Sequence, residues 1–206
     1  MTTPKAKLAG LALIAALCAG FTLGMTAPAW AGFDEGVAAY NRGDYAAALR
    51  EWHPLAEQGY AKAQYRLGLM YGTGKGVLQD YAEAVKWYRK ATEQGYAKAQ
   101  YRLGFMYFEG QGVPQDDARA VGWGRKAAEQ GDAEAQYFLG FMYFTGLGVP
   151  QDDAQAHMWF NLAASTFPPG EGRDIAVKNR DDVAMRMTPA QISEAQKLAR
   201  EWKPKK

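Results

Sequence analysis

Apolar and polar residues along this chain alternate at the spacing of helices, and their order returns every 36 residues. The segment AKAQYRLG at 61–68 recurs unchanged at 97–104 and, as AEAQYFLG, at 133–140. The same shift relates three tryptophans, Trp87, Trp123 and Trp159. Self-similarity at a period of this length is typical of solenoids, in which each repeat is one supersecondary unit.

Each unit is predicted to form two helices joined by a glycine-rich loop. In the first helix, about 61–71, one apolar stripe at helical spacing holds Ala63, Leu67 and Tyr71. Asp80 is placed to cap the second helix, and Glu83 completes a capping-box pattern. The buried stripe of that second helix holds Tyr81, Ala84, Val85, Tyr88 and Ala91.

One glycine lies inside each first helix, at Gly68, Gly104 and Gly140. Glycine in a helix interior costs about 1 kcal/mol relative to alanine, so a compensating contact is expected. The expected partners are small residues of the second helices, Ala84, Ala120 and Ala156. Such contacts would set the angle of each helical hairpin.

The two ends of the repeat array differ from its middle. Residues 45–59 align with 81–95, but the loop before them is four residues shorter, as in a tetratricopeptide repeat. At the other end, Ser165-Thr166-Phe167-Pro168 replaces the Glu-Gln-Gly stop of the earlier units. A helix at about 173–187 and another capped by Thr188, with Pro189 and Gln191 behind it, are predicted to cover the end of the stack.

The pattern A-x-A-Q-Y-x-L-G-x-M-Y, then G-x-G-V-x-Q-D, A-x-x-W and A-x-E-Q-G, resembles the Sel-one-like repeat family, a relative of the tetratricopeptide repeats. The resemblance covers roughly 33–166 and implies an all-α fold. The expected architecture is a right-handed α-solenoid of about four helix-turn-helix hairpins with a C-terminal helical cap. The expected boundaries are a signal peptide at 1–31, a short leading repeat at 32–60, Sel-one-like repeats at 61–96, 97–132 and 133–168, and the cap at 169–206.

The first residues have the layout of a secretory signal peptide. Lys5 and Lys7 precede an apolar run of about 16 residues, short of the roughly 20 that span a bilayer. Ala29-Trp30-Ala31 then fits the pattern that signal peptidase cuts. We predict cleavage after Ala31, a periplasmic or secreted location and no stable membrane span. The alternatives are a retained anchor and lipid attachment at Cys18, which the preceding Leu17 disfavours.

Charge and cysteine content narrow the function classes once the leader is set aside. The leader holds two of the 24 basic residues and none of the 22 acidic ones, so the rest of the chain is balanced. Apart from the tail at 203–206, no basic stripe indicates nucleic acid or an anionic membrane as partner. Because Cys18 is the only cysteine, its removal excludes disulfides, zinc–cysteine sites and cysteine nucleophiles.

Candidate catalytic residues are few. His53 and His157 belong to the second helices of the first and fourth units, too far apart for a shared metal site. The pairs Asp116-Asp117 and Asp152-Asp153 fall at helix starts, where carboxylates cap N–H groups. The stretch Gly74-Lys75-Gly76 lacks the strand and the Lys-Ser/Thr pair of a phosphate-binding loop. We therefore predict no catalytic residue, cofactor or metal.

Aromatic residues carry the functional hypothesis. The repeated tryptophans are assigned to packing. If Leu67, Gly68 and Tyr71 are packed as in tetratricopeptide repeats, the opposite phase of the first helices faces the concave groove. Those positions hold Tyr65, Leu69, Tyr101, Phe105, Phe108, Tyr137, Phe141 and Phe144, together with Lys62, Gly72, Lys98, Glu109 and Glu134. A contiguous apolar patch usually marks a binding surface. Alternatively, the hairpins pack more tightly, or the terminal cap folds over this face.

These features predict a non-catalytic, exported scaffold that binds a protein or peptide in its groove. The resemblance implies the same, because members of the family are adaptors in exported or membrane-associated complexes. Two alternatives remain. One is an enzyme of the β-lactam-binding or hydrolysing type associated with cysteine-rich family members, whose cysteines this chain lacks. The other is a purely structural protein whose groove is closed by self-association.

Overall fold

The computed structural model describes residues 29–205, which form ten α-helices and no strand. The all-α solenoid expected from the repeats is confirmed. Most of the expected signal peptide, including Cys18, lies outside the described residues. The helices are α1 (Ala29–Asn41), α2 (Tyr45–Glu57), α3 (Ala61–Thr73), α4 (Tyr81–Glu93), α5 (Ala97–Glu109), α6 (Asp117–Glu129), α7 (Ala133–Thr145), α8 (Asp153–Thr166), α9 (Glu171–Ala184) and α10 (Pro189–Glu201).

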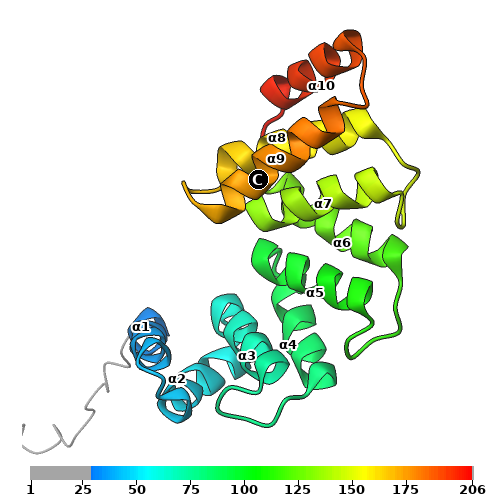
Figure 1. Cartoon of the computed structure of the whole chain (residues 1–206). Coiled ribbons are helices and arrows are strands. Elements are labelled where there is room, and N and C mark those ends of the chain that lie inside the picture. The colour runs from blue at the N-terminus through cyan, green and yellow to red at the C-terminus, as the bar shows by residue number, and fades with distance from the viewer. Residues whose placement is uncertain (1–28, 206) are drawn as a thin grey trace, which may run out of the picture.

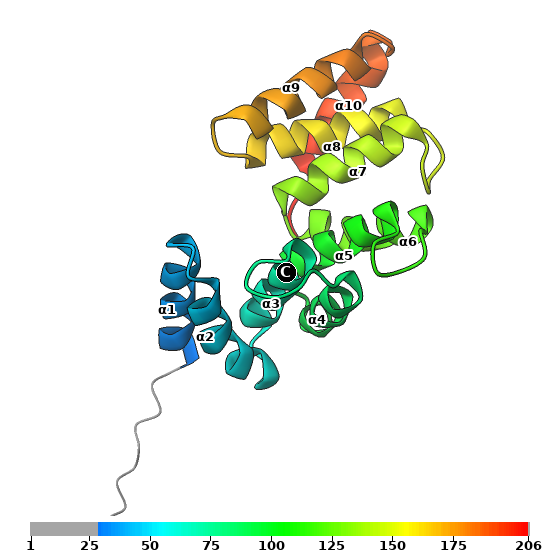
Figure 2. The same cartoon turned by 60° about the horizontal axis from the view of Figure 1, so that its bottom comes forward.

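The first eight helices form four antiparallel hairpins, which we number as units one to four from α1–α2 to α7–α8. Figure 1 shows these units following an arc, with α3 and α5 on its inner side and α4 and α6 outside. The second helix of each unit packs on the first helix of the next, as α2 does on α3, α4 on α5 and α6 on α7. The same succession of units is visible from another side in Figure 2.

Aspartates and loop glycines define where the second helices begin. The side chain of Asp80 accepts a hydrogen bond from the Glu83 backbone N–H at 2.9 Å, and Asp116 and Asp152 do the same in the next units. In the loop before α6, Gly112 has φ +68°, and a Cβ there would lie 2.3 Å from the Tyr81 carbonyl oxygen. No other residue fits this approach, so the G-x-G loop is a packing element between consecutive units.

The helix-interior glycines make close contacts, but mainly not with the expected alanines. A Cβ on Gly68 would lie 2.5 Å from the Tyr88 ring, and one on Gly140 would lie 2.8 Å from the Phe160 ring. Only in unit three does the expected partner contribute, because a Cβ on Gly104 would lie 3.0 Å from the carbonyl oxygen of Ala120. The expectation was therefore wrong for units two and four, where the glycine makes room for an aromatic ring of the second helix.

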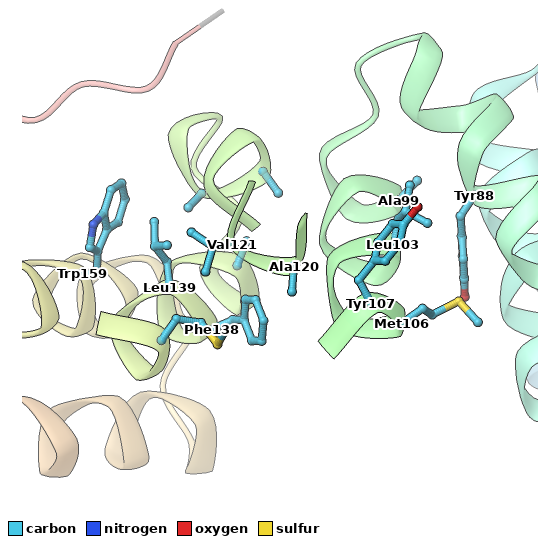
Figure 3. Close-up of a cluster of buried hydrophobic side chains, with 14 of the residues drawn as sticks. Tyr88, Ala99, Leu103, Met106, Tyr107, Ala120, Val121, Phe138, Leu139 and Trp159 are labelled. Carbon is cyan, nitrogen blue, oxygen red and sulfur yellow. The ribbon is translucent and has the colours of Figure 1, made fainter. Parts of the chain in front are cut away.

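A continuous apolar core runs from unit two to unit four. Leu103 of α5 and Leu139 of α7 are fully buried, and the buried Trp159 of α8 belongs to the same cluster. Figure 3 shows these side chains with Tyr88 facing α5 from the preceding unit. A smaller cluster around the fully buried Trp52 joins unit one to unit two. Burial of this apolar surface is the main source of stability in a fold without disulfides.

Buried glutamines of the first helices make hydrogen bonds both to the preceding hairpin and to the second helix of their own hairpin. Gln64 donates to the Ala56 carbonyl at 3.1 Å and accepts from the Gln94 amide at 2.9 Å. Gln100 accepts from Gln130 in the same way at 2.8 Å. In unit four Gln136 is fully buried, and its Oε1 has no hydrogen-bond partner in the described part of the chain. The residue at the partner position is Thr166, where the repeat departs from its pattern.

The two cap helices lie on different sides of α8. Helix α9 packs along α8, and its Asn179 donates to the Tyr137 hydroxyl at 2.8 Å. Helix α10 begins with the expected capping box of Thr188 and Gln191 and packs on α8 through a contact between Trp202 and Trp159, with ring centroids 6.3 Å apart.

The tail after α10 returns to unit three. The backbone N–H of Lys205 donates to the Glu129 carbonyl at 2.7 Å. The Lys205 ammonium also lies 2.9 Å from the Glu129 carboxylate. The last residues therefore reach past unit four to the end of α6.

Candidate functional site

The candidate site is the inner face, which we define as the surface of α3, α5 and α7 on the concave side of the arc. The eight residues expected to line it belong to these three helices, and seven of them are half-buried: Leu69, Tyr101, Phe105, Phe108, Tyr137, Phe141 and Phe144. The eighth, Tyr65, is buried and packs against the rings of Tyr88 and Tyr96. Tyr65 is therefore a packing residue between units two and three, and its assignment to an open groove was wrong.

The half-buried rings on α5 form a row that continues onto α7. Phe105 lies 6.3 Å from Tyr101 and also 6.3 Å from Phe108, centroid to centroid. Phe108 meets Phe138 at 5.7 Å and Phe141 at 6.1 Å, both edge to face, the geometry that aromatic pairs prefer. Tyr101, Phe105 and Phe108 are therefore packed against neighbouring rings and remain partly exposed.

Near unit four, α9 covers part of the inner face, as the alternative reading of the sequence allowed. A cavity of about 270 Å³ lies between α7, α8 and α9, and its lining includes Phe141, Phe144, Asn179 and Val183. The guanidinium of Arg186 lies 5.0 Å from the centre of the Phe144 ring. The cap thus narrows the groove at this end and leaves the surface of α3 and α5 without such a cover.

A second cavity lies between units two and three. It has a volume of about 160 Å³ and is lined by Leu69, Gly72, Thr73, Tyr81, Tyr88, Arg102, Phe105, Met106 and Gln111. The predicted groove residues Leu69 and Phe105 therefore share one depression. Arg102 was not among the predicted site residues, because the same repeat position holds Arg66 in unit two and Phe138 in unit four, and a surface arginine is unremarkable in sequence.

Charged groups on the inner face are few. The exposed Lys62 and Lys98 lie near the starts of α3 and α5, and the exposed Glu134 lies near the start of α7. Burial raises the pKa of Tyr101 to about 12, and it also raises the pKa of Tyr65 and Tyr88. These hydroxyls are therefore neutral at physiological pH.

The two histidines lie in different environments. His53 is exposed beside Trp87, whereas His157 is buried, and its pKa is lowered first by burial and then by the Arg180 guanidinium. Within residues 29–205, no cluster of three or more histidine, cysteine and acidic side chains is placed to hold a metal. No helix in this part of the chain is long and apolar enough to cross a bilayer.

The repeated tryptophans lie on the second helices and are largely packed. Trp87 and Trp159 are buried, and Trp123 is half-buried with the Lys126 ammonium 4.3 Å from its ring centre. None of the three belongs to the inner face. They provide a chemically similar set of aromatic residues on the outer helices, against which the inner-face rings can be compared.

Comparison with known proteins places these features among related folds. The Sel1 repeat model matches residues 61–96, 97–132 and 133–165. A Sel1 repeat protein from Oxalobacter formigenes is 30% identical, with a TM-score of 0.69, over 86% of this chain and 72% of that protein. A protective antigen of uropathogenic Escherichia coli strains with an SLR fold is 29% identical, with a TM-score of 0.58, over 84% of this chain. This chain spans 45% of that antigen's length. No curated protein matches the sequence significantly.

Proposed function

We propose, because this chain belongs to the Sel1 repeat family, that it is a non-catalytic scaffold whose inner face binds a peptide segment of a partner protein. Sel1 repeat proteins are generally non-catalytic and mediate protein interactions. The observation that carries the proposal is the row of half-buried aromatic rings on α5 and α7, which extends across two units and borders the cavity at Leu69 and Phe105.

The arrangement of these rings suits a peptide better than a small substrate. Tyr101, Phe105 and Phe108 lie along one helix, so they present an extended apolar track. Aromatic side chains held in a rigid packing lose little conformational entropy when a partner covers them, and they are enriched among residues that dominate binding energy.

Phe105 and Phe108 are the residues to change first, since α9 does not cover them. We expect the double substitution Phe105→Ser and Phe108→Ser to abolish capture of partner proteins from a cell-envelope extract. Each such anchor contributes on the order of 2 kcal/mol to an interface, about a thirtyfold change in affinity per residue. The measurement is capture by the immobilised protein, with quantitative mass spectrometry of the retained proteins.

Because these phenylalanines are half-buried, their loss also destabilises the fold, and the control must match this cost. Trp123→Ser removes a half-buried aromatic side chain of unit three from the outer helix α6 instead. Both variants should melt below the wild type, and capture is compared at a temperature where both are folded by circular dichroism. Equal loss of capture in the two variants would contradict a role for the inner face.

Export is the second part of the proposal and rests on the leader alone. If signal peptidase removes it, the exported chain begins at Gly32, because Ala29 and Ala31 occupy the two small-residue positions. N-terminal sequencing of the protein recovered from the periplasm or medium tests this. A lipid-modified chain beginning at Cys18 would contradict both the cleavage site and the free location.

A further inference from the structure

Arg102 is a half-buried cation without an ionic partner. No aspartate or glutamate of residues 29–205 places an oxygen within 4.0 Å of its guanidinium. Its Nε is buried and has no hydrogen-bond partner within the residues that the structure describes. The guanidinium interacts with the Tyr65 hydroxyl and lies 5.4 Å from the centre of the Tyr101 ring, and Glu134 acts on its charge only from beyond 4.0 Å.

Among the arginines of residues 29–205, Arg102 is the one whose Nε is buried without a hydrogen-bond partner. Arg89 and Arg125 donate to the hydroxyls of Tyr107 and Tyr143, and Arg119 pairs with Asp116 at 3.0 Å. A buried donor on a partly desolvated charge is costly when it has no acceptor, so a compensating interaction at this Nε is expected. A planar guanidinium is best compensated by a carboxylate, which it can bind through two parallel hydrogen bonds.

The cavity beside Arg102 indicates what accompanies the carboxylate. Its lining is mainly apolar, with Leu69, Tyr88, Phe105 and Met106 around Arg102. Its volume of about 160 Å³ is close to that of an engineered cavity of about 150 Å³ that holds one benzene molecule. The space therefore fits a single side chain of the size of leucine or phenylalanine, and not a larger rigid ligand.

We infer that Arg102 and this cavity form a subsite for a peptide in which a carboxylate stands close to a medium-sized apolar side chain. The carboxylate belongs to an aspartate, a glutamate or the peptide's C-terminus. This inference rests on the proposed function and adds a chemical preference to it.

The test uses displayed random decapeptides as probes. Selection on the immobilised wild-type protein should enrich peptides that place Asp, Glu or a free C-terminus near Leu, Ile, Met or Phe. Synthetic versions of the enriched peptides, in which each acidic residue is replaced by its amide, should bind about tenfold or more weakly in fluorescence anisotropy titrations, because a hydrogen bond to a charged group is lost. The preference should weaken as salt is added.

Arg102→Gln should remove the difference between acid and amide peptides. Arg66→Gln is the matched control, since Arg66 occupies the same repeat position but lies over the Trp52 ring, 5.4 Å from its centre, and does not line the cavity. Arg66→Gln should keep the preference. The melting temperature of Arg102→Gln should stay at or above that of the wild type, whereas a structural arginine would lower it.

The outcomes separate this inference from the proposed function. Enriched peptides without acidic groups, an unchanged acid preference in Arg102→Gln, or a lowered melting temperature in that variant each overturn the subsite. If the subsite is overturned but the selected peptides still lose binding to the variant with Phe105→Ser and Phe108→Ser, the inner face remains a binding surface that does not select for carboxylates. If selection yields no peptide, the subsite is overturned, and the capture experiment decides the proposed function by itself.

Discussion

Units three and four carry the same fully buried leucine, Leu103 and Leu139, but their second helices differ at the positions of Lys126 and Gln130. Lys126, exposed in unit three, is replaced by Leu162, which is buried beneath α10. Gln130, which completes a hydrogen bond in unit three, is replaced by Thr166. Unit four therefore keeps the buried core of a repeat, whereas its second helix carries different residues at the two positions that face the end of the array.

The strongest test of this comparison concerns the shared core. Leu103→Ala should lower the free energy of unfolding by about 2–5 kcal/mol, because it leaves a cavity at a site flanked by units on both sides. Leu139→Ala should cost a similar amount if unit four is a complete repeat. Leu49→Ala, at a half-buried position of the leading unit, should cost less. Urea titrations give the loss in free energy of unfolding for each variant. A much smaller loss for Leu139→Ala than for Leu103→Ala would mean that unit four is frayed.

The next largest effect on stability is expected at the position where unit three has Lys126 and unit four has Leu162. Leu162→Lys restores the residue of units two and three, but at this place it buries an ammonium beneath α10. We expect a loss of about 2–4 kcal/mol, with α10 released from α8. The reciprocal Lys126→Leu should change stability by no more than about 0.5 kcal/mol, because the position is exposed. Thermal melts of the two variants measure these changes. Similar losses of stability for Leu162→Lys and Lys126→Leu would contradict the burial of Leu162 beneath α10.

Gln130→Ala should leave unit three, like unit four, without a glutamine at the end of its second helix. It leaves the Oε1 of Gln100 buried without its donor, which costs about 1–3 kcal/mol. The matched Gln58→Ala removes an exposed glutamine from the equivalent helix end of unit one and should cost less. Chemical denaturation of the two variants provides the measurement, and equal costs would show that the glutamine pair contributes little.

The smallest expected effect runs in the opposite direction. Thr166→Gln supplies unit four with the missing donor for Gln136, whose Oε1 has no hydrogen-bond partner in the described part of the chain. One hydrogen bond of this kind should raise the free energy of unfolding by about 0.5–1.5 kcal/mol. A lower melting temperature would indicate that the end of α8 diverges too far from that of α6 for the bond to form.

Repetition made the fold predictable from the sequence. A 36-residue period with aspartates at helix starts located the hairpins, and Thr188 with Gln191 marked the start of α10. The helix predicted at about 173–187 lies at Glu171–Ala184, since Gly170 precedes its start and Met185 ends it. These features are local, so a single sequence carries them.

Contacts between units were harder to predict. The phase of a helix shows which residues face inward, but not that Tyr65 meets Tyr88 of its own unit and Tyr96 at the start of the next. It also does not show that Gly68 and Gly140 face aromatic rings instead of alanines. The same holds for the cap, where α9 and α10 both have an apolar stripe, and only the packing shows that they lie on different sides of α8.

The return of the C-terminal tail to the end of α6 has a mechanical consequence. A solenoid behaves as a spring whose stiffness is set by the joints between neighbours, because distant units do not touch. The double contact of Lys205 with Glu129 adds a tie across the joint between units three and four. Under tension applied to its two ends, the arc should therefore open first at the joints of units one to three, and units three and four with the cap should turn as a single rigid block.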